Sequence, residues 1–293
     1  MRRMIVAVSA WSLSIGVLAA AQENAPALPE QKTVEVLGAR IRYYELGPPA
    51  APTVLILHGL GDRGRNHLRS ALGLARSFHV LVPDQIGHGR SDKPRLSYRI
   101  RTFSDFDAGF LKAVGVSRAH VTGASLGGWI GADLAIRYPQ LVDRLVLVDS
   151  AGVSPPGRKL SREDIPRELY VTSLSDQRKI LERVFLDKAT ISDAMVEATF
   201  RDHVRDDDGG TIESILDGIA TDEESLDTRA AQIKSPTLVV WCRQDALLPV
   251  QAADVLKAAI PGSSLVLLEG CGHVPDAERT DEYNAAVLKF LGK

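Results

Sequence analysis

The sequence is poor in several residue types, and each shortage excludes something. Only 5% of the 293 residues are aromatic, so the core must be built mainly from Val, Leu, Ile and Ala. The formal net charge is −2, and without an excess of positive charge no nucleic-acid partner is expected. There are two cysteines, and neither directly follows the N-terminal apolar run, where a lipoprotein anchor would need one. Repeats and low-complexity segments are also absent, which leaves an ordinary globular composition.

The first residues have the three parts of a secretory signal peptide. Arg2 and Arg3 precede an apolar run that ends near Leu18, and three alanines follow at 19–21. The run is shorter than the roughly 20 residues that span a bilayer, which weighs against the alternative of an uncleaved anchor. We predict a signal peptide over residues 1–21, a flexible leader over 22–32, and a secreted or periplasmic protein without a stable membrane anchor after processing.

Strand-like and helical segments alternate along the rest of the chain, residues 33–293. Short apolar runs predict strands, and the run at 53–57 is of the kind found in parallel strands that are covered on both faces. This alternation predicts an α/β fold, a mostly parallel sheet with helices on both faces, whose chemistry lies at the carboxyl ends of the strands. The predicted strands are 33–37, 40–46, 53–57, 79–82, 119–122, 144–148, 236–241 and 264–268.

The alternation stops at about 151–228, where short helical patterns at 177–186 and 192–202 replace the strands. This block holds 10 Lys and Arg against 18 Asp and Glu, a net charge of about −8, while the rest of the chain is near +6. It has no tryptophan and only Tyr170, Phe185 and Phe200 as aromatic residues. We predict an inserted helical cap with solvated acidic outer faces and an aliphatic roof over a pocket.

The most informative stretch is A-H-V-T-G-A-S-L-G-G-W-I at 119–130, in which G-x-S-x-G stands between a strand and a helix. A serine at such a turn sits in strained backbone, with its hydroxyl directed out of the fold. The following helix aims its N-terminal N–H groups at the place where negative charge would develop. The alternative is a strand–helix turn that carries glycines and a serine by chance.

A serine nucleophile needs a base and a carboxylate that orients the base. His273 follows the last predicted strand in C-G-H, and Asp245 follows the preceding strand in R-Q-D. The order Ser125, Asp245, His273 therefore predicts a catalytic triad, with Asp149 as the rival for the acid role. Asp84 and His88 are expected to hold their loop by hydrogen bonds to the backbone. We expect the remaining histidines to be core or surface residues: His67, His79, His120 and His203.

Together these motifs resemble the α/β-hydrolase superfamily over roughly 33–293. The matching segments are H-G-L-G, D-Q-I-G-H-G-R-S, G-A-S-L-G-G, Q-D and C-G-H. The resemblance implies the α/β-hydrolase fold, an oxyanion hole formed by the backbone N–H groups of Leu60 and Leu126, and a helical cap. It also implies a reaction without metal or cofactor. Haloalkane dehalogenases and epoxide hydrolases carry Asp at the elbow, so Ser125 argues against both.

The two cysteines, Cys242 and Cys271, lie at the ends of strands that are neighbours in this fold family. In an oxidising compartment such a pair can form a disulfide, which would tie the Asp245 and His273 loops together. Two buried free thiols are the alternative, and the sequence leaves both open.

These observations predict a carboxylesterase or lipase-like serine hydrolase whose partner is a small-molecule ester. A carbon–carbon bond hydrolase of the meta-cleavage-product type and a non-catalytic ligand-binding relative remain the alternatives. The acidic cap disfavours strongly anionic substrates, and its aliphatic side chains favour short to medium acyl groups. The sequence does not indicate the oligomeric state.

Overall fold

The computed structural model describes residues 29–154, 165–219 and 224–292. The predicted signal peptide and most of the predicted leader lie outside these ranges. Along the chain the elements are β1 (Lys32–Val36), β2 (Ala39–Leu46), β3 (Thr53–Leu57), η1 (Gly64–His67), α2 (Leu68–Leu74), β4 (His79–Pro83), α3 (Ile100–Ala113), β5 (Ala119–Ala124), α4 (Leu126–Arg137), β6 (Val142–Val148), η3 (Arg167–Leu169), α5 (Leu174–Val184), η4 (Lys188–Thr190), α6 (Asp193–Asp206), α7 (Gly209–Ile219), η5 (Ala230–Gln232), β7 (Thr237–Cys242), α8 (Gln251–Ala259), β8 (Ser264–Leu268), α9 (Pro275–Glu278) and α10 (Thr280–Leu291).

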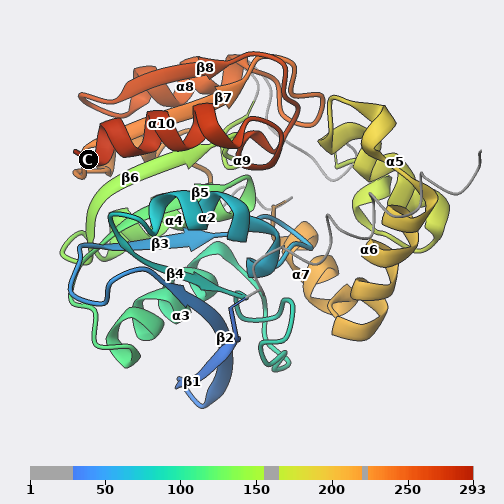
Figure 1. Cartoon of the computed structure of the whole chain (residues 1–293), viewed down its shortest axis with the longest axis horizontal. Helices are drawn as coiled ribbons and strands as arrows, with labels where there is room; N and C mark the ends of the chain where they lie inside the picture. The colour runs from blue at the N-terminus through green and yellow to red at the C-terminus, as the bar shows by residue number, and fades with distance from the viewer. Residues whose placement is uncertain (1–28, 155–164, 220–223, 293) are drawn as a thin grey trace, which may run out of the picture. The chain divides into compact units, whose positions relative to one another are not determined.

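The strands form one eight-stranded sheet in the order β1-β2-β4-β3-β5-β6-β7-β8 (Figure 1). β1 and β2 pair antiparallel, and β2 also runs antiparallel to β4, while the pairs from β4 to β8 are all parallel. The carboxyl ends of β3 and β5–β8 therefore lie on one edge of the sheet. This confirms the predicted fold class, a mostly parallel sheet of the α/β-hydrolase type.

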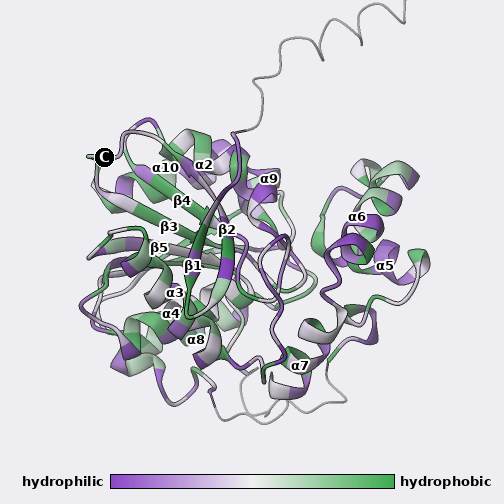
Figure 2. Ribbon diagram, turned by 90° about the horizontal axis from the view of Figure 1, so that it is seen from below, coloured by the Kyte–Doolittle hydropathy of each residue, from purple (hydrophilic) through white to green (hydrophobic). Residues whose placement is uncertain are grey.

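Helices cover both faces of the sheet, as predicted. One apolar layer joins the sheet to α3, α4 and α8 through side chains such as Phe103, Ile130 and Leu256. The other joins it to α2 and α10 through residues such as Leu74 and Val287. Every residue of β3, β4 and β7 is buried, which explains why each strand is apolar after its first residue. Figure 2 shows β3 and β4 coloured mainly as hydrophobic.

The sequence prediction and the structure differ at a few elements. β1 begins at Lys32, one residue inside the predicted leader. Between β3 and β4 the chain forms the 3₁₀ turn η1 followed by the short helix α2. α7 and α9 were not predicted, because α7 begins with two glycines and α9 has only four residues, too few to show a period.

The inserted segment between β6 and β7 contains α5, α6 and α7 and no strand among its described residues. Its small apolar cluster consists of Leu181, Ile191 and Val196, with Phe185 and Met195 packed against them. Across the part of the chain that the structure describes, no helix has the length and apolar character to cross a membrane.

Candidate active site

Ser125 occupies the sharp turn between β5 and α4. Its backbone has φ 53° and ψ −119°, a conformation that a residue with a side chain adopts only when its surroundings enforce it. The Ser125 N–H donates to the carbonyl of Val148 at 2.9 Å, and its carbonyl accepts from the N–H of Ala151 at 3.0 Å. The end of β6 therefore holds the elbow, and the side chain stands at the carboxyl edge of the sheet.

Two glycines of the motif are needed because the backbone passes too closely for a side chain. A Cβ on Gly123 would lie 2.1 Å from the carbonyl oxygen of Gly127, and one on Gly127 would lie 2.3 Å from the carbonyl oxygen of Leu57. Close packing of β5, α4 and the end of β3 depends on both positions. This contact also brings the loop after β3 against Ser125.

The loop after β3 carries one of the two backbone amides expected to form an oxyanion hole. A Cβ on Gly59 would lie 3.3 Å from the Ser125 Cβ and 3.9 Å from its Oγ, so this loop borders the serine. Leu60 follows Gly59 here, and Leu126 is the first residue of α4. Within the described part of the chain neither amide N–H donates a hydrogen bond. Both amides are therefore without a protein acceptor in this part of the structure.

The structure brings Asp245 and His273 together. The Asp245 Oδ2 lies 2.7 Å from Nδ1 of His273, and both side chains are buried, at 0% and 5% exposure. The other carboxylate oxygen accepts from the backbone N–H groups of Leu247 and Leu248, at 2.7 and 2.9 Å. Because a carboxylate only accepts, Nδ1 donates to Asp245, and Nε2 is the nitrogen left to exchange a proton with a neighbouring group. That Nε2 is buried and has no partner among the described residues.

Asp149, the rival for the acid role, faces a backbone amide rather than a histidine. Its Oδ1 accepts from the Cys242 N–H at 2.8 Å, and its Oδ2 has no partner in the described structure. Burial, together with the nearby charge of Asp245, raises the pKa of Asp149 well above its ordinary value. The neutral form is favoured, so Asp149 is a poor partner for an imidazolium, whereas Asp245 contacts the ring directly.

Cys242 and Cys271 form a disulfide, with their Cα atoms 5.6 Å apart. Of the two alternatives that the sequence leaves open, the structure contains the bonded pair. The bridge joins the end of β7 to the turn after β8, two residues before His273. It therefore connects the segments that present Asp245 and His273.

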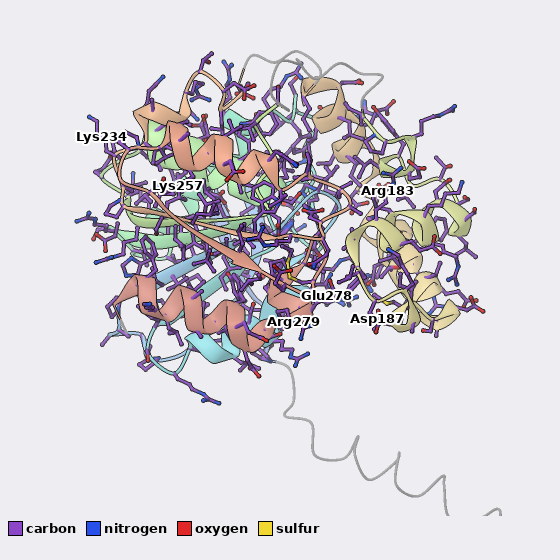
Figure 3. The ribbon with its side chains drawn as sticks, turned by 90° about the horizontal axis from the view of Figure 1, so that it is seen from above. Arg183, Asp187, Lys234, Lys257, Glu278 and Arg279 are labelled. Atoms are coloured by element: carbon purple, nitrogen blue, oxygen red, sulfur yellow. A yellow bond between two sulfur atoms is a disulfide. The ribbon has the colours of Figure 1, made fainter. Side chains whose placement is uncertain are left out.

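The cap contacts the histidine segment directly. The backbone N–H of His273 donates to the carbonyl of Val184 at the end of α5, at 2.7 Å. Glu278 of α9 accepts from the N–H of Gly272 at 2.7 Å with one oxygen, and from Leu186 and Asp187 with the other. Figure 3 shows Glu278 and Asp187 at this junction. The cap thus helps to fix the position of the histidine.

A second set of contacts joins the cap to the loop after β3. Arg63 is 5% exposed, and its Nη1 lies 2.7 Å from Asp206 and 3.2 Å from Asp202, both on α6. A Cβ on Gly61 would lie 3.1 Å from the Cε1 of His203, so this histidine also covers the loop. Two acidic residues of the cap are therefore paired with a buried arginine on its inner surface. The sequence predicts acidic residues on the solvated outer faces only.

Asp84 fixes its loop through hydrogen bonds to backbone N–H groups, as predicted, whereas His88 contributes little to the loop. The Asp84 carboxylate accepts from the N–H groups of Gly64 and Arg90, at 2.8 and 2.9 Å. Among the described residues His88 makes one long hydrogen bond, 3.4 Å between Nδ1 and the Ile86 carbonyl, and burial lowers its pKa to about 3. His67, expected to be an ordinary core or surface residue, lies between two carboxylates that come from different site segments. One of these carboxylates is remote in sequence, so no local motif could have revealed the arrangement.

Comparisons with known proteins agree with this geometry. The family model for the alpha/beta hydrolase fold matches residues 52–278. Lipase 1 of Psychrobacter immobilis is 32% identical over 253 residues, which cover 84% of this chain and 78% of the lipase. A 2-hydroxymuconate semialdehyde hydrolase of Pseudomonas putida is 28% identical over 288 residues, 92% of this chain and 98% of that enzyme.

Among solved structures, a membrane phospholipase A, described as a bacterial virulence factor, superposes with a TM-score of 0.82 at 32% identity. The alignment covers 94% of this chain and 91% of that one. The match to the family model runs along the chain from β3 to α9 and includes the elbow and the paired Asp245 and His273. On these grounds the chain belongs to the alpha/beta hydrolase family.

Proposed function

We propose that this protein is an exported serine hydrolase that cleaves small or medium carboxylic esters through an acyl-enzyme. The observation that carries the proposal is the buried His273, whose Nδ1 is held by Asp245 while its Nε2 has no partner among the described residues. Such a ring is prepared to accept a proton, and Ser125 stands at the same edge of the sheet in the conformation of a nucleophile elbow.

In the proposed mechanism, Ser125 Oγ attacks the ester carbonyl and His273 Nε2 takes the hydroxyl proton. The N–H groups of Leu60 and Leu126 stabilise the negative charge on the carbonyl oxygen. Collapse of the tetrahedral intermediate breaks the ester bond, and His273 returns the proton to the leaving alcohol. Water then attacks the acyl-enzyme by the same route and releases the acid, while Asp245 keeps the ring oriented. The mechanism requires no cofactor.

Two relatives support an ester substrate. The lipase and the phospholipase A, at 32% identity each, are named for cleavage of acyl esters. We therefore favour esters with aliphatic acyl groups. The proposed export is supported by the N-terminal pattern and by the disulfide, a bond typical of oxidising compartments. Mass analysis of the mature protein in periplasmic and culture fractions tests it, with Gln22 as the expected first residue.

A carbon–carbon bond hydrolase is the second candidate, because the semialdehyde hydrolase aligns over nearly its whole length. The argument from the acidic cap against anionic substrates is weakened by the pairing of Asp202 and Asp206 with Arg63. Measuring kcat/KM for one substrate of each class distinguishes the two candidates. We expect p-nitrophenyl butyrate to be turned over with a much larger kcat/KM than a dienoic meta-cleavage product, and Ser125→Ala to abolish the turnover.

Efficient cleavage of the dienoic substrate with only weak ester turnover would favour the second candidate. Absence of both activities, with no labelling by a fluorophosphonate, would favour the ligand-binding alternative.

A further inference from the structure

His67 is a buried histidine whose two ring nitrogens both face carboxylates. Its Nδ1 lies 2.6 Å from an Oδ2 of Asp276, and its Nε2 lies 2.9 Å from an Oδ2 of Asp62. The side chains of His67 and Asp276 are 5% and 7% exposed, and that of Asp62 is 27% exposed. The Ser70 hydroxyl donates to Asp276, and the Asn66 amide and the Arg63 N–H donate to Asp62.

This arrangement requires a charged ring. A carboxylate only accepts hydrogen bonds, so both nitrogens must donate, and only the imidazolium has two N–H groups. Burial alone lowers the pKa of His67, but Asp276 and Asp62 outweigh it and hold the pKa well above its ordinary value. The pKa of Asp62 is in turn lowered by His67, although burial alone would raise it. The other titratable neighbours are His58 beside His67 and Asp62, and Tyr283 and Asp149 beside Asp276.

The two carboxylates belong to the two segments that must be aligned for ester cleavage. Asp62 stands two residues after Leu60, whose N–H is an expected oxyanion donor. Asp276 stands in α9, three residues after His273. They are separated by more than 200 residues, and His67 hydrogen-bonds to both.

We propose that His67, as an imidazolium, is a positioning residue that holds the Leu60 loop against the turn carrying His273. Within the described structure no hydrogen bond joins its side chain to Ser125, so its effect passes through the two loops. This role rests on the proposed serine hydrolase function. This role differs from that of Glu278, which lies on α9 with Asp276 but contacts the cap (Figure 3).

The test is His67→Gln, which keeps a polar side chain of similar size but removes the charge and one of the two linked donors. Turnover of p-nitrophenyl butyrate is measured against the fraction of Ser125 that a fluorophosphonate labels. We expect kcat per labelled site to fall by about 10- to 100-fold, because a displacement of about 1 Å in such loops can cost 10²-fold. KM should change less than threefold, since the acyl pocket is untouched.

The pH profile supplies a readout that a structural role alone would not change. In the wild type, kcat should fall on the alkaline side as His67 loses its proton, and in His67→Gln this step should be absent. Asp62→Asn removes the charge from the contact with the Leu60 loop and leaves the more buried Asp276 paired with His67. It should lower kcat by about tenfold, and it keeps the test decisive if His67→Gln does not fold.

The matched control is His79→Gln. His79 is also a buried histidine beside a carboxylate, 2.8 Å from Glu45, but it lies at the start of β4, away from the carboxyl edge. Its kcat per labelled site should equal that of the wild type. If His67→Gln and Asp62→Asn stay within twofold of the wild type, or if His79→Gln loses as much activity as they do, the positioning role is wrong. A wild-type protein that is neither labelled nor active would instead refute the proposed function itself.

Discussion

The central strands and the cap bury different kinds of side chain. β3, β4 and β7 are buried along their whole length and are almost entirely apolar. The cap has a small apolar cluster of its own and joins the loop after β3 through Arg63, Asp202 and Asp206, all less than 10% exposed. Apolar burial is non-directional and follows the sequence period, whereas an ion pair depends on the exact placement of two groups. The strands of the sheet can therefore be predicted from local sequence patterns, whereas the contacts that position the cap cannot.

The largest effect should come from removing the nucleophile at the edge of the sheet, a change that leaves both the apolar core and the ion pairs of the cap intact. Ser125→Ala should lower kcat for p-nitrophenyl butyrate by about 10⁴- to 10⁶-fold, since the nucleophile is lost. Thermal unfolding should show the same Tm as the wild type, because one partly exposed hydroxyl is removed. Turnover by Ser125→Ala at or near the wild-type rate would contradict the mechanism.

Buried carboxyl groups also differ between the two regions: Asp107 packs beside the sheet without an ion pair in the described structure, whereas Asp202 and Asp206 of the cap are paired with arginines. Asp107 of α3 is 4% exposed, and its Oδ2 has no partner in the described structure. Burial raises its pKa from 3.8 to about 8. The unfolded chain therefore binds fewer protons between these values, and this group lowers the free energy of unfolding as pH rises, by about 1.4 kcal/mol per pH unit.

Asp107→Asn should remove this slope. Between pH 5 and pH 8 the stability of the variant relative to the wild type should increase by up to about 4 kcal/mol. Urea unfolding at several pH values measures the change, and comparing slopes cancels any constant cost of the amide. Parallel slopes in the two proteins would show that Asp107 is not held neutral.

In the cap the matching change is Arg63→Met, which removes the ion pairs of Arg63 with Asp202 and Asp206 while keeping an unbranched apolar chain. The free energy of unfolding should fall by about 3 kcal/mol, the low end for a broken buried pair, because Arg65 and Arg205 still contact Asp202. Arg40→Met is the control, since Arg40 pairs with Asp92 at an exposed site and should change stability little. Equal effects of the two substitutions would mean that the buried pairs do not seat the cap.

The same difference between local patterns and remote pairs decides which site residues can be predicted from the sequence. Ser125, Asp245 and His273 each stand next to a strand with a strong apolar pattern, so their common edge could be predicted. The structure indeed pairs Asp245 with His273. Arg63 and Asp206 are 143 residues apart, and His67 and Asp276 are 209 apart. No periodicity links such pairs, and a lone buried histidine has the same local sequence whether its neighbours are apolar or acidic.

The smallest expected effect concerns the acyl group. The apolar residues of the cap are mostly aliphatic, and Ile212 of α7 would lie 3.3 Å from a Cβ on Gly61, beside the expected oxyanion loop. Each buried methylene should contribute about 0.8 kcal/mol, roughly a fourfold gain in kcat/KM. We expect kcat/KM to rise from p-nitrophenyl acetate to the butyrate or hexanoate and to fall by the dodecanoate. A continued rise to the dodecanoate would show that the cap does not limit chain length.

The central claim is that Ser125 is the nucleophile and that His273 activates it. The most direct measurement is peptide mapping by mass spectrometry after treatment of the folded protein with a fluorophosphonate. The account predicts one adduct, located on Ser125, absent in Ser125→Ala and formed far more slowly in His273→Ala. A protein that hydrolyses esters yet carries no adduct on Ser125, or carries one on another residue, would contradict it.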